Sequence, residues 1–164
     1  MASTSADSYE QLSYQNTKMS QHIGWARQII GDAVATRTLL PKESGALCLM
    51  DSAAGVIYTL PTPVIGMQFE FATTVTRTSN AHKIITATAA QFLLGEIFMY
   101  TTATASGAGF AADGTTIRAL SSNGTTSGGI IGDRYRVTAI SSTVWLIDGV
   151  CVGSGTIVTP FATS

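Results

Sequence analysis

The stretch RYRVTAISSTVWLIDGVCV, residues 134–152, decides the fold class of this chain. Its first six residues place Tyr, Val and Ala at every second position with Arg or Thr between them, which is the alternation of a half-buried β-strand. Two apolar runs, at 144–147 and 150–152, flank Asp148-Gly149, a dipeptide typical of two-residue hairpin turns. The stretch therefore predicts one strand followed by a β-hairpin around Asp148 and Gly149.

Similar strand signals extend back to residue 34. Segments rich in Val, Ile, Thr and Phe are separated by Gly, Pro, Asn and Ser, the residues that form turns. Strands do not alternate with helical patterns, and the number of short strands, about nine or ten, indicates an all-β fold. We predict a β-sandwich or jelly-roll-like domain over residues 34–164, whose earlier strands lie at 34–40, 46–50, 56–60, 67–74, 82–87, 92–100 and 115–120.

Two neighbouring segments, 92–100 and 101–114, depart from simple alternation. The first, FLLGEIFMY, is apolar on both faces, which indicates burial on two sides, either inside the sandwich or at a seam between subunits. The second, TTATASGAGFAADG, consists of small residues around one Phe. We predict a long exposed loop or a loosely held lobe for this second segment.

Residues 1–33 differ from the rest of the chain and are predicted to form an N-terminal arm. Leu12, Met19, Ile23 and Ile30 have spacings that suit one face of a helix, so the arm is expected to be part-helical or else extended. Trp25 adds a large ring to a segment with little core of its own. We predict that these side chains dock on the body of the domain, on another subunit or on a capsid.

The C-terminal tail, GTIVTPF at residues 155–161, is uncharged and largely apolar. An apolar terminus left in water invites aggregation by strand pairing. We therefore expect the tail to be docked, with Val158 and Phe161 as its anchors.

The composition indicates a subunit of an assembly. Only 12% of the residues are charged, 45% are hydrophobic, and the net charge is −1. Soluble domains carry about 25% charged residues, which keep their surfaces hydrated and apart. Nucleic acid is not an expected partner, because the basic field that it needs is missing. A membrane is not expected either, since no apolar segment reaches the roughly 20 residues of a spanning helix.

We predict no catalytic residue, metal site or cofactor, since the phosphate-binding, zinc-binding and CxxC motifs are missing. His82 is expected to be a polar histidine at the rim of the domain, with a catalytic triad as the alternative. Glu70 and Glu96 are expected to point outward from strands, with a paired-acid glycosidase site as the alternative. Cys48 and Cys151 are expected to be buried, reduced thiols, with a disulfide as the alternative.

Several runs of residues resemble β-rich virion proteins of tailed bacteriophages. They are TLL (38–40), MDSAAG (50–55), TLPTP (59–63), GMQFEF (66–71), TSNAHKIIT (78–86), VW (144–145) and GSGT (153–156). Within that group the chain is similar above all to the capsid decoration, or cement, proteins. The resemblance spans residues 38–164.

The resemblance implies a homotrimer on the outer surface of a phage head, where it clamps neighbouring copies of the major capsid protein against the pressure of packaged DNA. The implied location is the capsid exterior of the virion, with assembly in the host cytoplasm. Head-fibre and tail-fibre modules carry similar motifs. The alternative is therefore a fibre module that binds host surface glycans, for example through the hydroxyl groups of residues 101–114.

Overall fold

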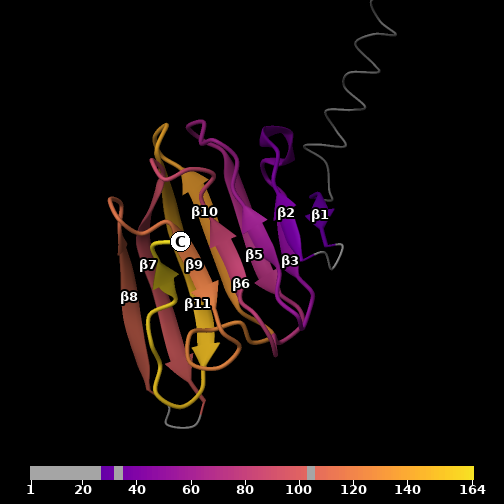
Figure 1. The fold of residues 1–164 in the computed structure, drawn as a ribbon, viewed down its shortest axis with the longest axis vertical. Helices are drawn as coiled ribbons and strands as arrows, with labels where there is room; N and C mark the ends of the chain where they lie inside the picture. The colour runs from indigo at the N-terminus through magenta and orange to yellow at the C-terminus, as the bar shows by residue number, and fades with distance from the viewer. Residues whose placement is uncertain (1–26, 32–34, 103–105) are drawn as a thin grey trace, which may run out of the picture.

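The computed structural model describes residues 27–31, 35–102 and 106–164, which form a β-sandwich of two layers (Figure 1). Twelve strands make up its two sheets, and the described residues add one short 3-10 turn, η1 (Pro41–Glu43). Each sheet contains both parallel and antiparallel pairs. The prediction of an all-β sandwich is confirmed.

The larger sheet has seven strands in the order β1-β3-β5-β10-β11-β7-β8. Their bounds are Ile29–Ile30 (β1), Leu47–Met50 (β3), Gln68–Thr73 (β5), Arg134–Ala139 (β10), Val144–Gly153 (β11), Phe92–Thr101 (β7) and Gly107–Asp113 (β8). One face of this sheet packs on the second sheet. The opposite face is termed the outer face.

The smaller sheet has five strands in the order β12-β9-β6-β4-β2. Their bounds are Phe161–Ala162 (β12), Ala119–Ser122 (β9), His82–Ile85 (β6), Ile57–Thr59 (β4) and Thr36–Thr38 (β2). The C-terminal tail is thus docked, as expected, because β12 pairs antiparallel with β9.

From β2 to β6 the chain changes sheet at every strand. Strands β2, β4 and β6 belong to the smaller sheet, and β3 and β5 belong to the larger sheet. Strands that neighbour each other in this part of a sheet are therefore parallel, as in the pairs β2–β4, β4–β6 and β3–β5. Each connecting loop crosses from one layer to the other, so the two layers are tied together repeatedly by the covalent chain.

The core lies between the sheets and is built from large side chains of both. The Tyr58 ring packs at a tilt on Phe71 with centroids 5.5 Å apart, and Trp145 packs on Phe69 at 6.1 Å. Tilted, offset contacts are the geometry that aromatic pairs favour. The hydroxyl of Tyr58, in the smaller sheet, donates to the Leu49 carbonyl of the larger sheet at 2.8 Å. This hydrogen bond joins the two layers inside the core.

The prediction of a hairpin at Asp148-Gly149 is wrong, because β11 runs straight through both residues. Its ladder is continuous on both sides, antiparallel with β10 and parallel with β7. The turn lies instead between β10 and β11, where the Ile140 N–H donates to the Val144 carbonyl at 3.1 Å. Gly149 serves close packing, since a Cβ there would lie 2.6 Å from the carbonyl oxygen of Arg134.

The prediction of a long exposed loop at 101–114 is wrong over Gly107–Asp113, which form β8 and pair antiparallel with β7. Phe110 lies opposite Ile97 in this ladder and packs against the core, and Ala112 is buried. Glycine and alanine carry almost no contrast in hydrophobicity, so a strand made of them leaves little periodicity in the sequence.

The C-terminal end of the predicted arm belongs to the sandwich. Ile29 and Ile30 form β1, which pairs parallel with β3, and Ile30 is buried. A helical face that includes Ile30 is therefore wrong, because the backbone of this residue joins the edge of β3 instead. The other predicted anchors of the arm, Leu12, Met19, Ile23 and Trp25, lie outside the described residues.

Candidate interaction surfaces

His82 is fully buried, so the prediction of a polar histidine at the rim is wrong. Its Nδ1 accepts a hydrogen bond from the Val56 N–H at 3.1 Å, and its Nε2 donates to the Val75 carbonyl at 3.3 Å. Burial lowers the pKa of His82, which favours the neutral ring. Both ring nitrogens are therefore committed to the backbone, and this histidine has no nitrogen left for a catalytic triad.

Glu70 and Glu96 point outward from β5 and β7, as predicted. Strands β10 and β11 lie between them, so the two carboxylates are three interstrand spacings apart. Three spacings amount to about 14 Å. Paired acids of glycosidases lie roughly 5–9.5 Å apart, so these two do not match that arrangement.

A buried carboxylate, that of Asp133, holds the loop before β10. Asp133 is fully buried and accepts hydrogen bonds from the Gly129 N–H at 2.7 Å, the Val152 N–H at 2.8 Å and the Tyr135 hydroxyl at 3.2 Å. Burial raises the pKa of Asp133, and the backbone hydrogen bonds act against that rise. Because its oxygens are occupied in this way, Asp133 fastens the loop to β11.

The described part of the chain offers no evident site for metal or thiol chemistry. It contains no group of three or more His, Cys, Asp or Glu side chains that could hold a metal ion. Cys48 and Cys151 are buried and unlinked, as predicted, and burial raises the pKa of each thiol to about 12. Among the same residues, no helix has the length and apolar character needed to cross a membrane.

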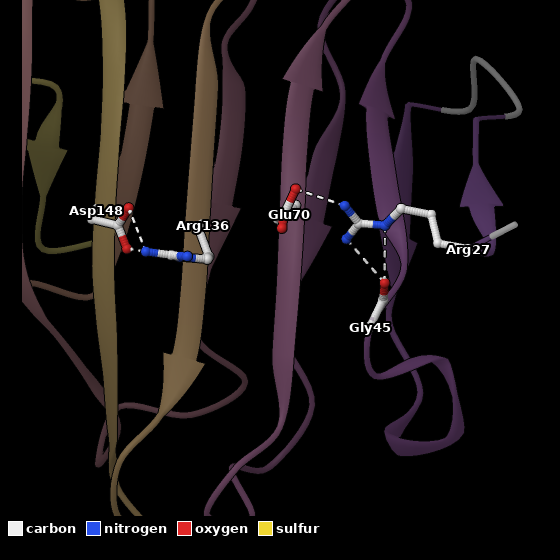
Figure 2. Close-up of polar contacts among 5 residues, drawn as sticks. All are labelled: Arg27, Gly45, Glu70, Arg136 and Asp148. Atoms are coloured by element: carbon white, nitrogen blue, oxygen red, sulfur yellow. Dashed lines mark hydrogen bonds and ion pairs between the residues drawn. The ribbon is translucent and has the colours of Figure 1, made fainter. Parts of the chain in front are cut away.

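Charged side chains cross the middle of the outer face (Figure 2). The Arg27 guanidinium binds Glu70 at 2.7 Å and donates to the Gly45 carbonyl at 3.0 and 3.2 Å. Arg136 binds Asp148 through two nitrogen–oxygen contacts of 3.1 and 3.3 Å. Exposed ion pairs contribute about 0–1 kcal/mol each to stability. These pairs therefore contribute little to the stability of the fold, and their main effect is to make this part of the outer face charged.

Beside these charges, the outer face is apolar on β7 and β11. Five large side chains there have exposed fractions of 36–51% and are termed the outer patch: Leu94, Phe98, Tyr100, Leu146 and Val150. The β7–β11 ladder sets Leu146 opposite Leu94 and Val150 opposite Phe98. Burial of residues 92–100 inside the sandwich is therefore wrong for the outer side of β7, and the alternative of a seam stays a prediction.

Glu96 interrupts the outer patch. It lies opposite Asp148 in the β7–β11 ladder, and no cation of the described residues forms an ion pair with it. Two adjoining hollows of about 470 and 420 Å³ flank Val150. The first is lined by Glu70, Arg134 and Arg136, and the second by Glu96, Phe98 and Gly109.

A second exposed apolar surface lies at the end of the sandwich where β5 begins and β10 ends (Figure 1). Val64 and Ile65, before β5, are 59% and 73% exposed, and Ile140, after β10, is 44% exposed. The two loops are joined, because the Gly66 N–H donates to the Ala139 carbonyl at 2.9 Å. Val64, Ile65 and Ile140 are together termed the apolar tip.

The predicted anchors within the described residues do not form one surface. Ile30 and Phe161 are buried in the sandwich itself, in β1 and β12. Val158 is exposed, and its N–H donates to the Thr126 carbonyl at 2.9 Å. Val158 is therefore the one described anchor whose side chain is available to a partner.

Sequence reasoning found part of the outer patch and missed the apolar tip. The run at 92–100, apolar on both faces, was the signal for the β7 half of the patch. Leu146 and Val150 were not recognised as part of the patch, because the expected hairpin placed them on two different strands and β11 contains both. Val64 and Ile65 follow a proline-rich turn, and two adjacent loop residues carry no periodicity that a sequence pattern would reveal.

No family model, curated protein or solved structure matches this chain. The outer patch and the apolar tip are the features of the described residues on which a functional proposal rests.

Proposed function

We propose that this chain is a structural virion protein that binds the outer surface of a phage capsid as a homotrimer and stabilises the lattice against internal DNA pressure. The resemblance of residues 38–164 to decoration proteins supports the proposal. The low share of charged residues, 12%, and the net charge of −1 also support a subunit of an assembly. The single structural observation that carries the proposal is the apolar tip.

The apolar tip suits contact with a protein surface. Val64, Ile65 and Ile140 project from two loops that continue the β5–β10 ladder, where the Ala139 N–H donates to the Met67 carbonyl at 2.8 Å. Side chains on loops held in this way lose little conformational freedom on binding. Apolar anchors that fill pockets of a partner supply much of the energy of protein–protein interfaces.

The fold suits a clamp. Loops that cross between the sheets, and the hydrogen bond from Tyr58 to Leu49, oppose separation of the two layers. A trimer carries three apolar tips, so contacts that are weak singly add through effective concentration, by roughly 10²–10⁴ in affinity. A cement protein of this design needs no single strong site.

Binding to undecorated phage heads tests the proposal. Heads assembled from the major capsid protein of the same genome are incubated with the full chain, and bound protein is measured after co-sedimentation. We expect saturable binding for the wild type. We expect at least tenfold weaker binding for Ile65→Asp, because a carboxylate at the tip must lose its hydration on docking.

Ile131→Asp is the matched control for Ile65→Asp. Ile131 is 61% exposed and lies at the far end of β5, where the neighbouring Gly132 N–H donates to the Thr73 carbonyl. This variant should bind heads like the wild type. Equal binding by Ile65→Asp and the wild type would contradict the role given to the apolar tip. No binding of the wild type to heads would contradict the proposed function.

Analytical ultracentrifugation tests the trimer separately. We expect a compact particle of three times the 17.1 kDa chain mass. A monomer at every concentration would contradict a trimer in solution, and a trimer with a high frictional ratio would favour a fibre module.

The alternative, a head-fibre or tail-fibre module that binds host glycans, has less support. Trp145 is buried and offers no exposed ring for stacking on a sugar. Half of the segment 101–114 is the strand β8, whose seven residues carry no hydroxyl group, so the hydroxyl groups that suggested sugar binding are confined to residues 101–106, of which Thr101 is buried. Binding of the full chain to a glycan array, without binding to heads, would favour this alternative.

A further inference from the structure

We propose that the outer patch is covered by residues 1–26 of the same chain, the segment that precedes the described residues. The patch consists of five side chains that are 36–51% exposed: Leu94, Phe98, Tyr100, Leu146 and Val150. Since an aromatic side chain presents roughly 150–250 Å², partial exposure of five large residues leaves on the order of 400 Å² uncovered. Docking of this kind does not depend on capsid binding.

The chain enters the sandwich on the outer face. The side chain of Arg27, the first described residue of the sandwich, extends over β3 to bind Glu70 of β5 at 2.7 Å (Figure 2). Its guanidinium also donates to the Gly45 carbonyl at 3.0 Å. Ile29, two residues later, is exposed, whereas Ile30 faces the core. The segment before Arg27 therefore starts beside the face that carries the outer patch.

The segment is long enough to reach the outer patch. Five interstrand spacings separate β1 from β7, which amounts to about 24 Å at about 4.8 Å each. A helix over residues 12–26 is about 22 Å long, and an extended chain of the same residues reaches about 50 Å. The extended chain spans this distance and the full helix does not. In an extended chain Lys18, nine residues before Arg27, reaches about 30 Å, which passes β7.

The segment also complements the patch chemically. Leu12 and Met19 are apolar residues of the part of the segment that an extended chain brings to the patch. Lys18 is the only Lys or Arg of the segment, and Glu96, at the middle of the patch, has no ion pair with a described cation. Apolar residues with Lys18 among them match an apolar patch that holds one carboxylate, and the two carboxylates of the segment, Asp7 and Glu10, lie farther along the chain from Arg27 than Leu12 does.

A second copy of the sandwich is a poorer occupant of the outer patch. Stable association between proteins buries about 800 Å² on each partner, roughly twice what the patch leaves uncovered. A symmetric contact between two patches would also bring the Glu96 and Asp148 carboxylates of both copies together, and like charges across an interface repel. The N-terminal segment meets neither obstacle.

Limited trypsin digestion of the full chain tests the docking, because Lys18 provides a cleavage site within the segment. We expect the bond after Lys18 to be cut at least tenfold more slowly in the native wild type than in a peptide of residues 9–26. The double variant Phe98→Asp/Val150→Asp, which places two carboxylates in the patch, should restore cleavage to nearly the rate of the peptide. Ile131→Asp is the matched control and should keep the protection.

Carbodiimide cross-linking identifies the chain that supplies the segment. In a mixture of ¹⁴N-labelled and ¹⁵N-labelled protein, we expect Lys18–Glu96 cross-links within chains of one label. Links between the two labels would assign the segment to a neighbouring copy and overturn the proposal.

Two other results would overturn it: cleavage of the native wild type at the rate of the peptide, or protection that persists in the double variant. Far-ultraviolet circular dichroism, which reports the β-strands, shows whether each variant keeps the sandwich. If the double variant loses this signal, the single variant Phe98→Asp takes its place. The same two results, measured on that variant, would overturn the proposal.

Discussion

Glu96 lies directly opposite Asp148 in the parallel ladder of β7 and β11. Arg136 forms an ion pair with Asp148 but not with Glu96. Directly opposed like charges destabilise a sheet by about 0.2–1 kcal/mol. The pair also stands between apolar neighbours, Leu94 and Leu146 on one side and Phe98 and Val150 on the other. The carboxylate of Glu96 is the proposed contact of Lys18, the one Lys or Arg of residues 1–26.

A double-mutant cycle between Lys18 and Glu96 measures that charge contact. In a Lys18→Gln background, Glu96→Gln should raise the free energy of unfolding, because it removes the repulsion with Asp148. In the wild-type background the gain should be smaller by about 0.2–1 kcal/mol, since the exposed pair with Lys18 is lost. Urea unfolding at low salt gives the four values, and added salt should reduce the difference.

The matched control for this cycle uses Glu70, whose partner is Arg27. The same cycle between Lys18 and Glu70→Gln should give no coupling. Equal coupling of Lys18 to both glutamates would show a general charge effect and would contradict a specific contact with Glu96.

Gly149→Ala should lower the free energy of unfolding by about 1–3 kcal/mol, because the methyl group has no space. Its Cβ would lie 2.6 Å from the Arg134 carbonyl oxygen and 2.8 Å from the Tyr135 ring. Gly109→Ala in β8 is the matched control, since a Cβ there meets nothing within 4 Å. Thermal and urea unfolding of both variants provides the measurement. A neutral Gly149→Ala would contradict the continuous β11 strand.

Parts of the fold were predictable because large and polar residues alternate there. The strands at 68–73 and 134–139 carry Phe, Tyr and Val on the buried side, so their period is visible in the sequence. β8 was not predictable, because its glycines and alanines give no such contrast. Asp148-Gly149 has the local signal of a turn, yet two strands from distant parts of the sequence complete its ladder on both sides. Tertiary pairing overrides local turn preference there.

The candidate surfaces were less predictable than the fold. The apolar tip exists because two loops 74 residues apart in sequence, at Gly66 and at Ile140, are brought together by the pairing of β5 with β10. No sequence pattern records such a meeting. The burial of His82 was likewise concealed, because its partners are backbone groups of Val56 and Val75 and not side chains with a recognisable motif.

Acid should destabilise the protein through His82. Burial lowers its pKa in the folded state below the ordinary value of 6.5, and protonation would also remove the acceptor of the Val56 N–H. The unfolded chain therefore takes up the proton first. The free energy of unfolding should fall as the pH drops below about 6.5, and this group should contribute no pH dependence above that value. Urea unfolding at pH 7.5 and 5.5 measures the loss.

His82→Gln is the comparison that isolates this effect. The variant should lose less stability than the wild type between the two pH values, because glutamine does not titrate. Asp133, whose pKa is raised by burial, changes stability in the opposite direction as the pH falls, and it is common to both proteins. The same pH dependence in the variant and the wild type would contradict the role given to His82.

The two cysteines should be inert in the native protein. Both thiols are buried, and burial raises the pKa of each to about 12, so the reactive thiolate is scarce at neutral pH. A thiol reagent such as dithionitrobenzoate should label neither Cys48 nor Cys151 in buffer and both in denaturant. Rapid labelling of Cys151 in buffer would mean that the sandwich opens near β11.

Cryo-electron microscopy of undecorated phage heads mixed with the full-length protein tests the central claim most directly. The proposed function predicts three-fold density on the outside of the shell, fitted by three sandwiches whose Val64 and Ile65 loops face the major capsid protein. Heads without added density, or density in which the side chains of Val64 and Ile65 point away from the shell, would contradict it.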